Sequence, residues 1–536
     1  MKSSLLALGL GLALLSGAAS AATVLPINAD PEGQGLNDPT PIAPSGGNPG
    51  TTIGEQRRIA YQFAADLWGA VLESDAEIRV QASFQPLQCD ARVVLGSAGT
   101  SPIYILTEPG QPDTLYHGAL ADAIIGRDLQ NGAGVDIISR FNASYGRTNP
   151  DGSPCSPGSG WYYGLDGKTP AGLTNFLNVV MHEIAHGLGF SGFGNVSTGA
   201  PLAGYPDIYS RFAFDNNSQR GWYEMNNADR LAALSGNNVV FRGQNVKNQL
   251  PLLLDEKVAL RASGTLTGAF EYGTASFGPD ATSANFSGSV VLVNDGSALP
   301  TQGCEASPAG AYTGRIVLVD RGTCGFEVKA FYAQQSGAVA VLVANNAPGV
   351  VSMGDTPEVE ATIPTLSVSQ ADGNAIKAAL PGVSLALAKV PGQFAGADAN
   401  GFARLYVPSP IQPGSTFSHY DVTTSPNALM EPSITATLQA NVMLDLTPAL
   451  FQDEGWTLNS GTARLGDCDT GIPVVEEGGL IPGATVIAIS RVCKIGTTNR
   501  GGYQSCMDAN KQSLLAQGVL RGNQGGKMMS CAAKMR

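Results

Sequence analysis

The chain has 536 residues, which is too long for one hydrophobic core and predicts two or three domains. Its 31 basic and 44 acidic residues give a net charge of -13, which argues against nucleic acid and anionic membranes as partners. Eight cysteines and 67 glycines are typical of an exported protein that is rich in loops, sheet and disulfide bonds.

The first 21 residues have the pattern of a secretory signal peptide. Lys2 is their basic residue, an apolar run extends from Leu5 to Leu15, and Ala19-Ser20-Ala21 is a small-residue cleavage site. The run is too short to span a bilayer, and no other segment reaches that length, so we expect a secreted (extracellular or periplasmic) protein with no membrane span. Residues 22–51 are rich in Pro, Gly, Asn and Asp and predict a flexible lead-in.

Residues 52–169 predict a helix followed by several strands. Apolar residues recur at helical spacing over Gly54–Leu72 and alternate with polar residues over Ile78–Phe84. Further strand candidates are Val93–Leu95, Tyr104–Leu106 and Val135–Phe141. This order predicts an α+β lobe whose sheet lies above a site on the next helix.

That next helix carries the motif His182-Glu183-Ile184-Ala185-His186. Thr169-Pro170 predicts its start, because Thr is a good N-cap and proline suits the first helical position, and Gly189 predicts its end. Positions i and i+4 share a helix face, so His182 and His186 can present two imidazoles to one zinc ion, with Glu183 beside them as a general base. The alternative is a helix with two ordinary buried histidines.

A catalytic zinc site needs three protein ligands and one open position. In the compact pattern H-E-x-x-H-x-x-G-x-x-H the third histidine follows the glycine by three residues, but here that position is Gly192. The nearest acidic alternatives are Asp207 and Glu224. The remaining histidines are His117, which we expect in a loop, and His419.

A resemblance favours His419. The segment Ser418-His419-Tyr420-Asp421, followed by Leu429-Met430, resembles the third-ligand region and Met-turn of the leishmanolysin-like metzincin zinc peptidases, in which a long insertion precedes the third histidine. The resemblance implies that His419 is the third zinc ligand and that Met430 packs beneath the metal without binding it. It also implies a two-lobed α+β fold, with a twisted sheet and an active-site helix, formed by residues 52–251 and 412–458.

The intervening residues 252–411 resemble a protease-associated (PA) domain. The resemblance rests on Asp320-Arg321-Gly322-Thr323-Cys324-Gly325-Phe326 and on the continuous apolar runs around it, which suit buried strands. We expect helices at Phe326–Ser336 and Asp372–Leu380 and a strand at Ile363–Val368. Such a domain is not catalytic, and the resemblance implies that it binds substrates or partners or restricts access.

Residues 459–536 predict a small C-terminal tail held by disulfide bonds, because they carry four of the eight cysteines. Proximity in the sequence favours bridges Cys89–Cys155 and Cys304–Cys324. Two more bridges are expected within the last four cysteines, which are Cys468, Cys493, Cys506 and Cys531.

Together, the motif and the resemblance predict a secreted zinc metalloendopeptidase that acts on proteins or peptides, with Glu183 as general base and acid. The alternative is a catalytically silent secreted binding protein that uses the PA domain and has a structural metal site. Glu183 favours the enzyme, because a structural site has no use for that carboxylate and would need a fourth ligand.

Overall fold

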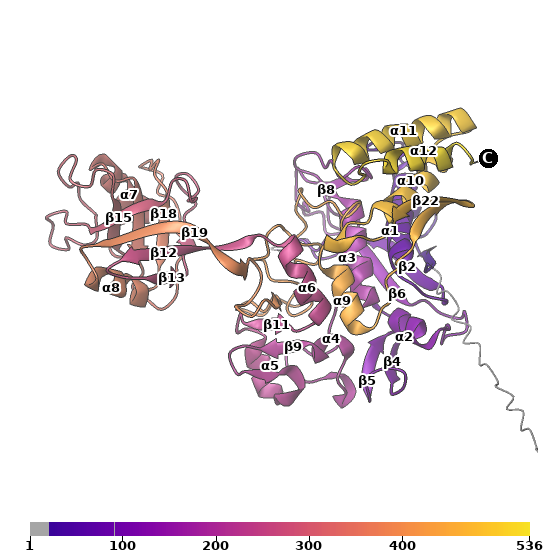
Figure 1. The fold of residues 1–536 in the computed structure, drawn as a ribbon, viewed down its shortest axis with the longest axis horizontal. Coiled ribbons are helices and arrows are strands. Elements are labelled where there is room, and N and C mark those ends of the chain that lie inside the picture. Colours follow the sequence, from indigo (N-terminus) through magenta and orange to yellow (C-terminus); the bar gives the residue numbers. More distant parts are fainter. Residues whose placement is uncertain (1–20, 91, 536) are drawn as a thin grey trace, which may run out of the picture. The chain divides into compact units, whose positions relative to one another are not determined.

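The computed structural model describes residues 21–90 and 92–535. All of the predicted signal peptide except Ala21 lies outside the described residues. The chain forms two compact units (Figure 1): the first contains the chain up to Asp255 and from Gly396 onward, and the second is Glu256–Ala395. The second unit is shorter than the predicted insertion 252–411. No helix in the described part is long and apolar enough to cross a membrane.

A four-stranded sheet and two helices build the core of the first unit. Strands β1 (Val24–Asn28), β2 (Ile78–Gln85) and β6 (Ile137–Asn142) are parallel, and the edge strand β3 (Gly96–Thr100) runs antiparallel to β6. Helix α3 (Phe176–Leu188) packs against β3, β6 and helix α1 (Ile53–Val71). Aromatic side chains fill the space between sheet and helix, with the rings of Phe84 and Phe141 each in contact with Phe176.

Residues 22–51 are folded, which corrects the prediction of a flexible lead-in. Strand β1 pairs with β2 over five residue pairs, from Val24 with Ile78 to Asn28 with Ala82. The Asp30 carboxylate then accepts hydrogen bonds from the backbone N–H groups of Leu36 and Phe84. The polar residues of this segment therefore close turns against the sheet.

The strand predicted at Val93–Leu95 is also wrong. The chain instead forms β3 from the five small residues that follow, Gly96 to Thr100. A glycine is needed at position 96 because β3 packs closely on α3 there: a Cβ on Gly96 would lie 2.6 Å from Oε1 of Glu183. Apolar alternation does not reveal a strand of this composition.

Helix α3 begins at Phe176, six residues after the predicted start at Pro170. Residues 174–175 form strand β8, which pairs with β7 (Trp161–Tyr162) and keeps the chain extended. Asn175 is the N-cap, since its side-chain oxygen accepts from the backbone N–H of Asn178. The predicted end is confirmed, because Leu188 is the last helical residue and Gly189 is the C-cap.

The rest of the first unit surrounds this core with short elements. Before the second unit they are β4 (Ile103–Leu106), β5 (Thr114–His117), α2 (Gly118–Ile125), α4 (Ile208–Arg211), β9 (Ala213–Asp215), β10 (Arg220–Gly221), α5 (Asn227–Ala233), β11 (Val239–Phe241) and α6 (Gln244–Leu253). After it come β20 (Ala403–Arg404) and α9 (Thr447–Glu454). Strands β9, β10, β11 and β20 form a second sheet that joins the two parts of this unit.

The predicted C-terminal tail belongs to the first unit and is not a separate appendage. It forms a hairpin and three helices, of which α10 packs against α1. The elements are β21 (Thr462–Leu465), β22 (Cys468–Pro473), α10 (Pro482–Ile495), α11 (Arg500–Ala516) and α12 (Gln524–Ala532). Disulfide Cys468–Cys531 joins β22 to α12, and Cys493–Cys506 joins α10 to α11. The predicted bridges Cys89–Cys155 and Cys304–Cys324 are confirmed.

The second unit is built on an eight-stranded mixed sheet. The order of the strands is β13-β12-β19-β15-β16-β17-β18-β14, and β15 to β18 are parallel neighbours. The strands are β12 (Glu256–Gly264), β13 (Gly268–Phe270), β14 (Gly273–Thr274), β15 (Ser287–Leu292), β16 (Ile316–Asp320), β17 (Ala340–Ala344), β18 (Thr365–Val368) and β19 (Val383–Phe394). Helices α7 (Phe326–Gln335) and α8 (Gln370–Ala378) confirm the two predicted helices to within two residues at each end.

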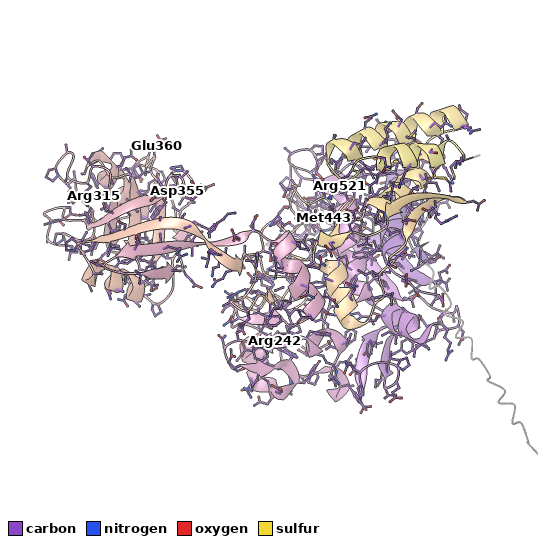
Figure 2. The ribbon with its side chains drawn as sticks, in the orientation of Figure 1. Arg242, Arg315, Asp355, Glu360, Met443 and Arg521 are labelled. Atoms are coloured by element: carbon purple, nitrogen blue, oxygen red, sulfur yellow. A yellow bond between two sulfur atoms is a disulfide. The ribbon has the colours of Figure 1, made fainter. Side chains whose placement is uncertain are left out.

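An open pocket of about 550 Å³ lies on the second unit, and Asp355 and Glu360 are among its lining residues (Figure 2). The buried Glu327 carboxylate shapes it by accepting hydrogen bonds from the backbone N–H groups of Thr356 and Ala361.

Candidate metal centre

Three histidines from distant parts of the sequence meet beside α3. Nε2 of His182 lies 3.0 Å from Nε2 of His186 and 3.2 Å from Nε2 of His419, although 237 positions separate His182 from His419. They form the one group of three or more potential ligand side chains within 4.8 Å among the described residues. The structure thus brings together the three histidines that the motif and the resemblance single out.

The other nitrogen of each ring is held by a main-chain carbonyl. Nδ1 of His182 lies 2.7 Å from the carbonyl oxygen of Leu429. Nδ1 of His186 lies 2.8 Å from the carbonyl oxygen of Phe190, and Nδ1 of His419 lies 2.8 Å from the carbonyl oxygen of Ser415. A carbonyl only accepts, so each Nδ1 must carry the proton and donate. Each Nε2 is then an unprotonated lone pair.

Burial keeps these rings neutral. The exposed fractions of His182, His186 and His419 are 7%, 7% and 5%. Burial, followed by the charge of His186, lowers the pKa of His182 to about 3. Burial lowers the pKa of His186 to about 4 and that of His419 well below its usual value. At neutral pH, the Nε2 atoms of the three neutral imidazoles therefore lie close together, and none of them carries a proton.

This arrangement fits a zinc ion. Neutral imidazole nitrogen is a preferred zinc ligand, and main-chain partners that orient the far side of each ring are typical of zinc sites. For Zn–N bonds of about 2.0–2.1 Å, tetrahedral ligand atoms are about 3.3 Å apart. The two Nε2 separations of 3.0 and 3.2 Å are close to that value.

Glu183 lies on α3 next to His182 and is 5% exposed. Burial raises the pKa of its carboxyl group to about 8. A divalent cation at the neighbouring histidines would favour the ionised form and lower that pKa, which suits a group that exchanges a proton near neutral pH. Gly96 of the edge strand leaves room for this side chain.

The segment around Met430 is bonded through its backbone to His182 and to the residue after His419. Met430 is fully buried, and its carbonyl accepts from the backbone N–H of Tyr420, the residue after His419. The preceding residue, Leu429, holds His182 through its carbonyl and donates its N–H to Oδ2 of Asp445. Asp445 therefore holds the residue whose carbonyl orients His182.

Gly192, which breaks the compact pattern, makes room for the segment that carries His419. A Cβ at this position would lie 2.9 Å from Cε1 of Phe417, two residues before His419. The hydroxyl of Tyr209 also donates to the Phe417 carbonyl at 2.8 Å. The absence of a side chain at Gly192 thus lets the segment that carries His419 pack against the turn after α3.

The alternative ligands have other contacts. Asp207 accepts from the backbone N–H of Ser210 and from the hydroxyl of Tyr223, which makes it the N-cap of α4. Glu224 accepts from the backbone N–H of Gly221. Neither carboxylate belongs to the histidine group.

His117 corrects a further prediction, since it ends strand β5, where a loop was expected, and is fully buried. Its Nε2 lies 2.9 Å from the hydroxyl of Ser191, and its ring packs on Phe193. Sequence reasoning also missed Gly96, Asp445 and the three carbonyl acceptors. Every residue has a carbonyl, so those acceptors carry no signal in the sequence.

Comparison with known proteins identifies one part of the chain. The family model described as PA domain matches residues 286–376, so the second unit contains a PA domain. The chain is 35% identical over 140 residues to vacuolar-sorting receptor 2 from Arabidopsis thaliana, which covers 23% of this chain and 22% of that protein. It is 37% identical over 101 residues to probable leucine aminopeptidase 2 from Aspergillus fumigatus. This match covers 18% of this chain and 20% of that protein. The chain thus spans about a fifth of the length of these relatives.

Solved structures give only distant matches. A zinc aminopeptidase from Bacillus subtilis, BSAP, is 20% identical with a TM-score of 0.19, and the match covers 28% of this chain and 37% of that chain. An aminopeptidase from Aneurinibacillus sp. strain AM-1 is 17% identical with a TM-score of 0.19, covering 28% and 38%. Similarity at this level carries no argument about the first unit.

Proposed function

We propose that the protein is a secreted zinc-dependent endopeptidase of the leishmanolysin-like metzincin type. The observation that carries the proposal is the convergence of three Nε2 lone pairs from His182, His186 and His419, each fixed by a carbonyl behind it, with Glu183 adjacent. A purely structural zinc site would be closed by a fourth protein ligand. The group of potential ligand side chains in the described part has three members, which suits a site with an open position.

The chemistry divides between metal and protein. A zinc ion at the three histidines would lower the pKa of a coordinated water toward about 7 and polarise the carbonyl of the bond to be cleaved. The Glu183 carboxylate would take a proton from the attacking water and deliver it to the leaving amine. The carbonyls of Leu429, Phe190 and Ser415 would hold the imidazoles in one orientation throughout.

The edge strand β3 is the best candidate for binding the substrate. In the described sheet it pairs only with β6, so its other edge has backbone N–H and C=O groups available for an extended peptide. Gly96 in this strand lies against Glu183, which would bring a peptide paired there close to the general base. The proposed substrates are therefore proteins or peptides in extended conformation.

The test uses internally quenched peptides with acetylated N-termini, so that an aminopeptidase cannot act on them. Wild-type protein should cleave them, a chelator should abolish cleavage, and added zinc should restore it. Glu183→Ala should lose about 10²–10⁴-fold in activity while it keeps its zinc. Glu224→Ala is the matched control and should remain active, because Glu224 lies outside the histidine group.

Other outcomes would redirect the proposal. Equal cleavage by wild type and Glu183→Ala would exclude the proposed mechanism, and cleavage of unblocked peptides alone would indicate an aminopeptidase. Wild-type protein that binds zinc but cleaves nothing would favour a silent binding protein. Zinc content tests the third ligand: it should fall well below wild type in His419→Ala, and unchanged zinc would contradict this assignment.

A further inference from the structure

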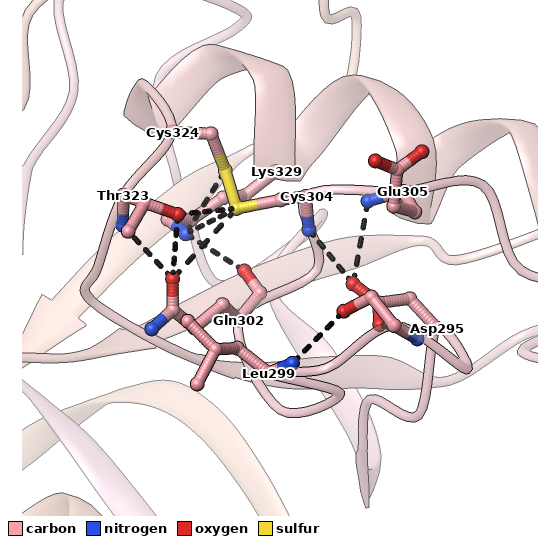
Figure 3. The surroundings of a disulfide bond; sticks show 9 residues. Asp295, Leu299, Gln302, Cys304, Glu305, Thr323, Cys324 and Lys329 are labelled. Atoms are coloured by element: carbon pink, nitrogen blue, oxygen red, sulfur yellow. Dashed lines mark hydrogen bonds between the residues drawn. A yellow bond between two sulfur atoms is a disulfide. The ribbon is translucent and has the colours of Figure 1, made fainter.

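A buried lysine contacts a disulfide bond in the second unit (Figure 3). Lys329 on α7 is fully buried, and its Nζ donates to the Gln302 carbonyl at 2.7 Å. The same Nζ lies 3.2 Å from Sγ of Cys324 and 3.5 Å from Sγ of Cys304. Figure 3 shows the ammonium nitrogen directed at the bonded pair of sulfurs.

The partners of this ammonium group are poorly matched to its charge. A carbonyl and two disulfide sulfurs are neutral acceptors, and burying a cation without a paired anion is costly. Burial accordingly lowers the pKa of Lys329 to about 8, against the attraction of Asp320 and Asp295. A thiolate at the position of either sulfur would supply the missing negative charge, so the electrostatics favour the reduced state more than usual.

The two sulfurs are not equivalent. Cys324 is nearer to Nζ and comes two residues before the first residue of α7, where the helix N-terminus stabilises an anion. Cys304 is farther from Nζ, and its backbone N–H donates to Oδ2 of Asp295, which puts a carboxylate beside this cysteine. Cys324 is therefore the better thiolate, and the better leaving group in an exchange reaction.

We propose that Cys304–Cys324 is a site of thiol–disulfide exchange with dithiol reductants, with Cys324 as the leaving thiolate. A thiolate of the dithiol attacks Sγ of Cys304, a new mixed disulfide forms, the Cys304–Cys324 bond breaks, and its electron pair passes to Sγ of Cys324 beside Lys329. The second thiol of the reductant then attacks the mixed disulfide and releases Cys304. The dithiol is oxidised, the protein disulfide is reduced, and the two protons of the dithiol pass to the cysteines or to solvent.

The other three disulfides lack this environment. In Cys468–Cys531, Sγ of Cys531 lies 3.4 Å from the neutral main-chain carbonyl oxygen of Asp469. Cys89–Cys155 packs in an apolar cluster with Leu95, Tyr145 and Trp161. The sulfurs of Cys493–Cys506 accept only from the neutral amide of Asn510 at 3.8 Å. Among the described residues, Lys329 is the charged group that donates to a disulfide sulfur, so exchange should be selective for Cys304–Cys324.

The test titrates the full-length protein with dithiothreitol redox buffers, followed by alkylation and mapping of each cysteine by mass spectrometry. Cys304–Cys324 should be reduced at a lower dithiol ratio than the other three bridges. Lys329→Met should shift its equilibrium about tenfold toward the disulfide, which corresponds to about 30 mV for a two-electron couple. Lys389→Met is the matched control and should leave the equilibrium unchanged, because Lys389 is exposed and pairs with Glu256, neither of which contacts the disulfide or Lys329.

Two outcomes would overturn the inference: a Lys329→Met equilibrium equal to that of wild type, or reduction of Cys304–Cys324 no earlier than the other bridges. If Lys329→Met does not fold, wild-type protein still decides the matter. After exposure to a monothiol, the trapped mixed disulfide should be on Cys304, and in the reduced protein Cys324 should be alkylated faster than Cys304 at pH 7. A mixed disulfide on Cys324 would contradict the assigned leaving group. None of these measurements depends on the metal centre.

Discussion

Gly96 is a residue whose missing side chain matters directly to the metal centre. A Cβ at this position would lie 2.6 Å from Oε1 and 3.0 Å from Cγ of Glu183, so Gly96→Ala must displace that buried side chain. If Glu183 is the general base as proposed, we expect peptide cleavage to fall at least about tenfold, because a displaced base transfers a proton less well. Zinc content should stay near the wild-type level, since the three histidines are not touched.

Gly99 in the same strand is the control for this prediction. No atom lies within 4 Å of a Cβ built there, so Gly99→Ala should retain activity. Equal loss of activity in both variants would mean that the strand is generally intolerant of side chains and that Gly96 has no special relation to Glu183.

His117 tests how burial of a titratable ring affects stability. Burial, followed by the charge of His186, lowers its pKa from 6.5 to about 3. Between those pH values the unfolded chain binds a proton that the folded chain does not. The free energy of unfolding contributed by His117 is therefore complete above pH 6.5 and is lost as the pH falls toward 3.

The variant His117→Gln keeps a polar group near Ser191 but does not titrate. Its free energy of unfolding should therefore depend less steeply on pH between 4 and 6, by about 1 kcal/mol per pH unit. Urea unfolding followed by tryptophan fluorescence measures this, because all four tryptophans (Trp68, Trp161, Trp222 and Trp456) lie in the first unit. Parallel pH profiles for the two proteins would rule out the assigned contribution.

At the scale of elements, the start of α3 makes a further prediction. Asn175 is the N-cap, so Asn175→Ala should lower the free energy of unfolding by about 1 kcal/mol. Thr169→Ala removes the residue that the sequence favours as the cap and should cost less, since Thr169 only accepts from the Asn175 amide. A larger effect at Thr169, measured by the same urea unfolding, would place the cap where the sequence predicts it.

Helices and strands with strong apolar periodicity could be predicted from the sequence. Those whose residues are set by contacts with distant segments could not. The patterns at Gly54–Leu72 and Ile78–Phe84 match α1 and β2 closely, because the apolar side chains that set each period are buried. Strand β3 has no apolar alternation, and at Gly96 the approach of α3 leaves no room for a side chain. The prediction of a flexible lead-in at residues 22–51 was wrong for a related reason. The Asp30 carboxylate accepts from the backbone N–H of Phe84, and a polar composition does not reveal a partner so distant in the sequence.

The metal centre shows the same limit. His182, Glu183 and His186 are readable because helical spacing alone brings them together. His419 could be chosen only through a family resemblance, since no local pattern predicts contact across 237 positions. The carbonyls of Leu429, Phe190 and Ser415 could be identified as the partners of the three rings only from the folded backbone.

At the scale of the whole molecule, the second unit should be removable. The unit begins at Glu256 and ends at Ala395, and Glu256 is paired with Phe394 across strands β12 and β19. Replacement of residues 257–393 by a two-residue Asn-Gly turn therefore reconnects neighbouring backbone positions. We expect a folded first unit that binds zinc as the full chain does, with a similar tryptophan unfolding curve.

The excised segment 256–395 should fold alone when it is expressed separately, because its apolar cluster on one face of the sheet draws only on its own residues, among them Leu260, Phe286, Leu318 and Leu385. Circular dichroism with a cooperative thermal transition checks this. Aggregation of the shortened first unit, in conditions where the full chain is soluble and holds zinc, would show that the two units depend on each other.

The distance along the chain between His182 and His419 also sets an order of events during synthesis. At about 5–20 residues per second, roughly 10 to 50 s pass between the addition of the first histidine and the last, and the whole second unit is made in that interval. Until His419 is added, only the two imidazoles of α3 are present of the three that form the candidate metal centre. If the protein is a peptidase, its own growing chain is therefore spared at least until His419 has been added.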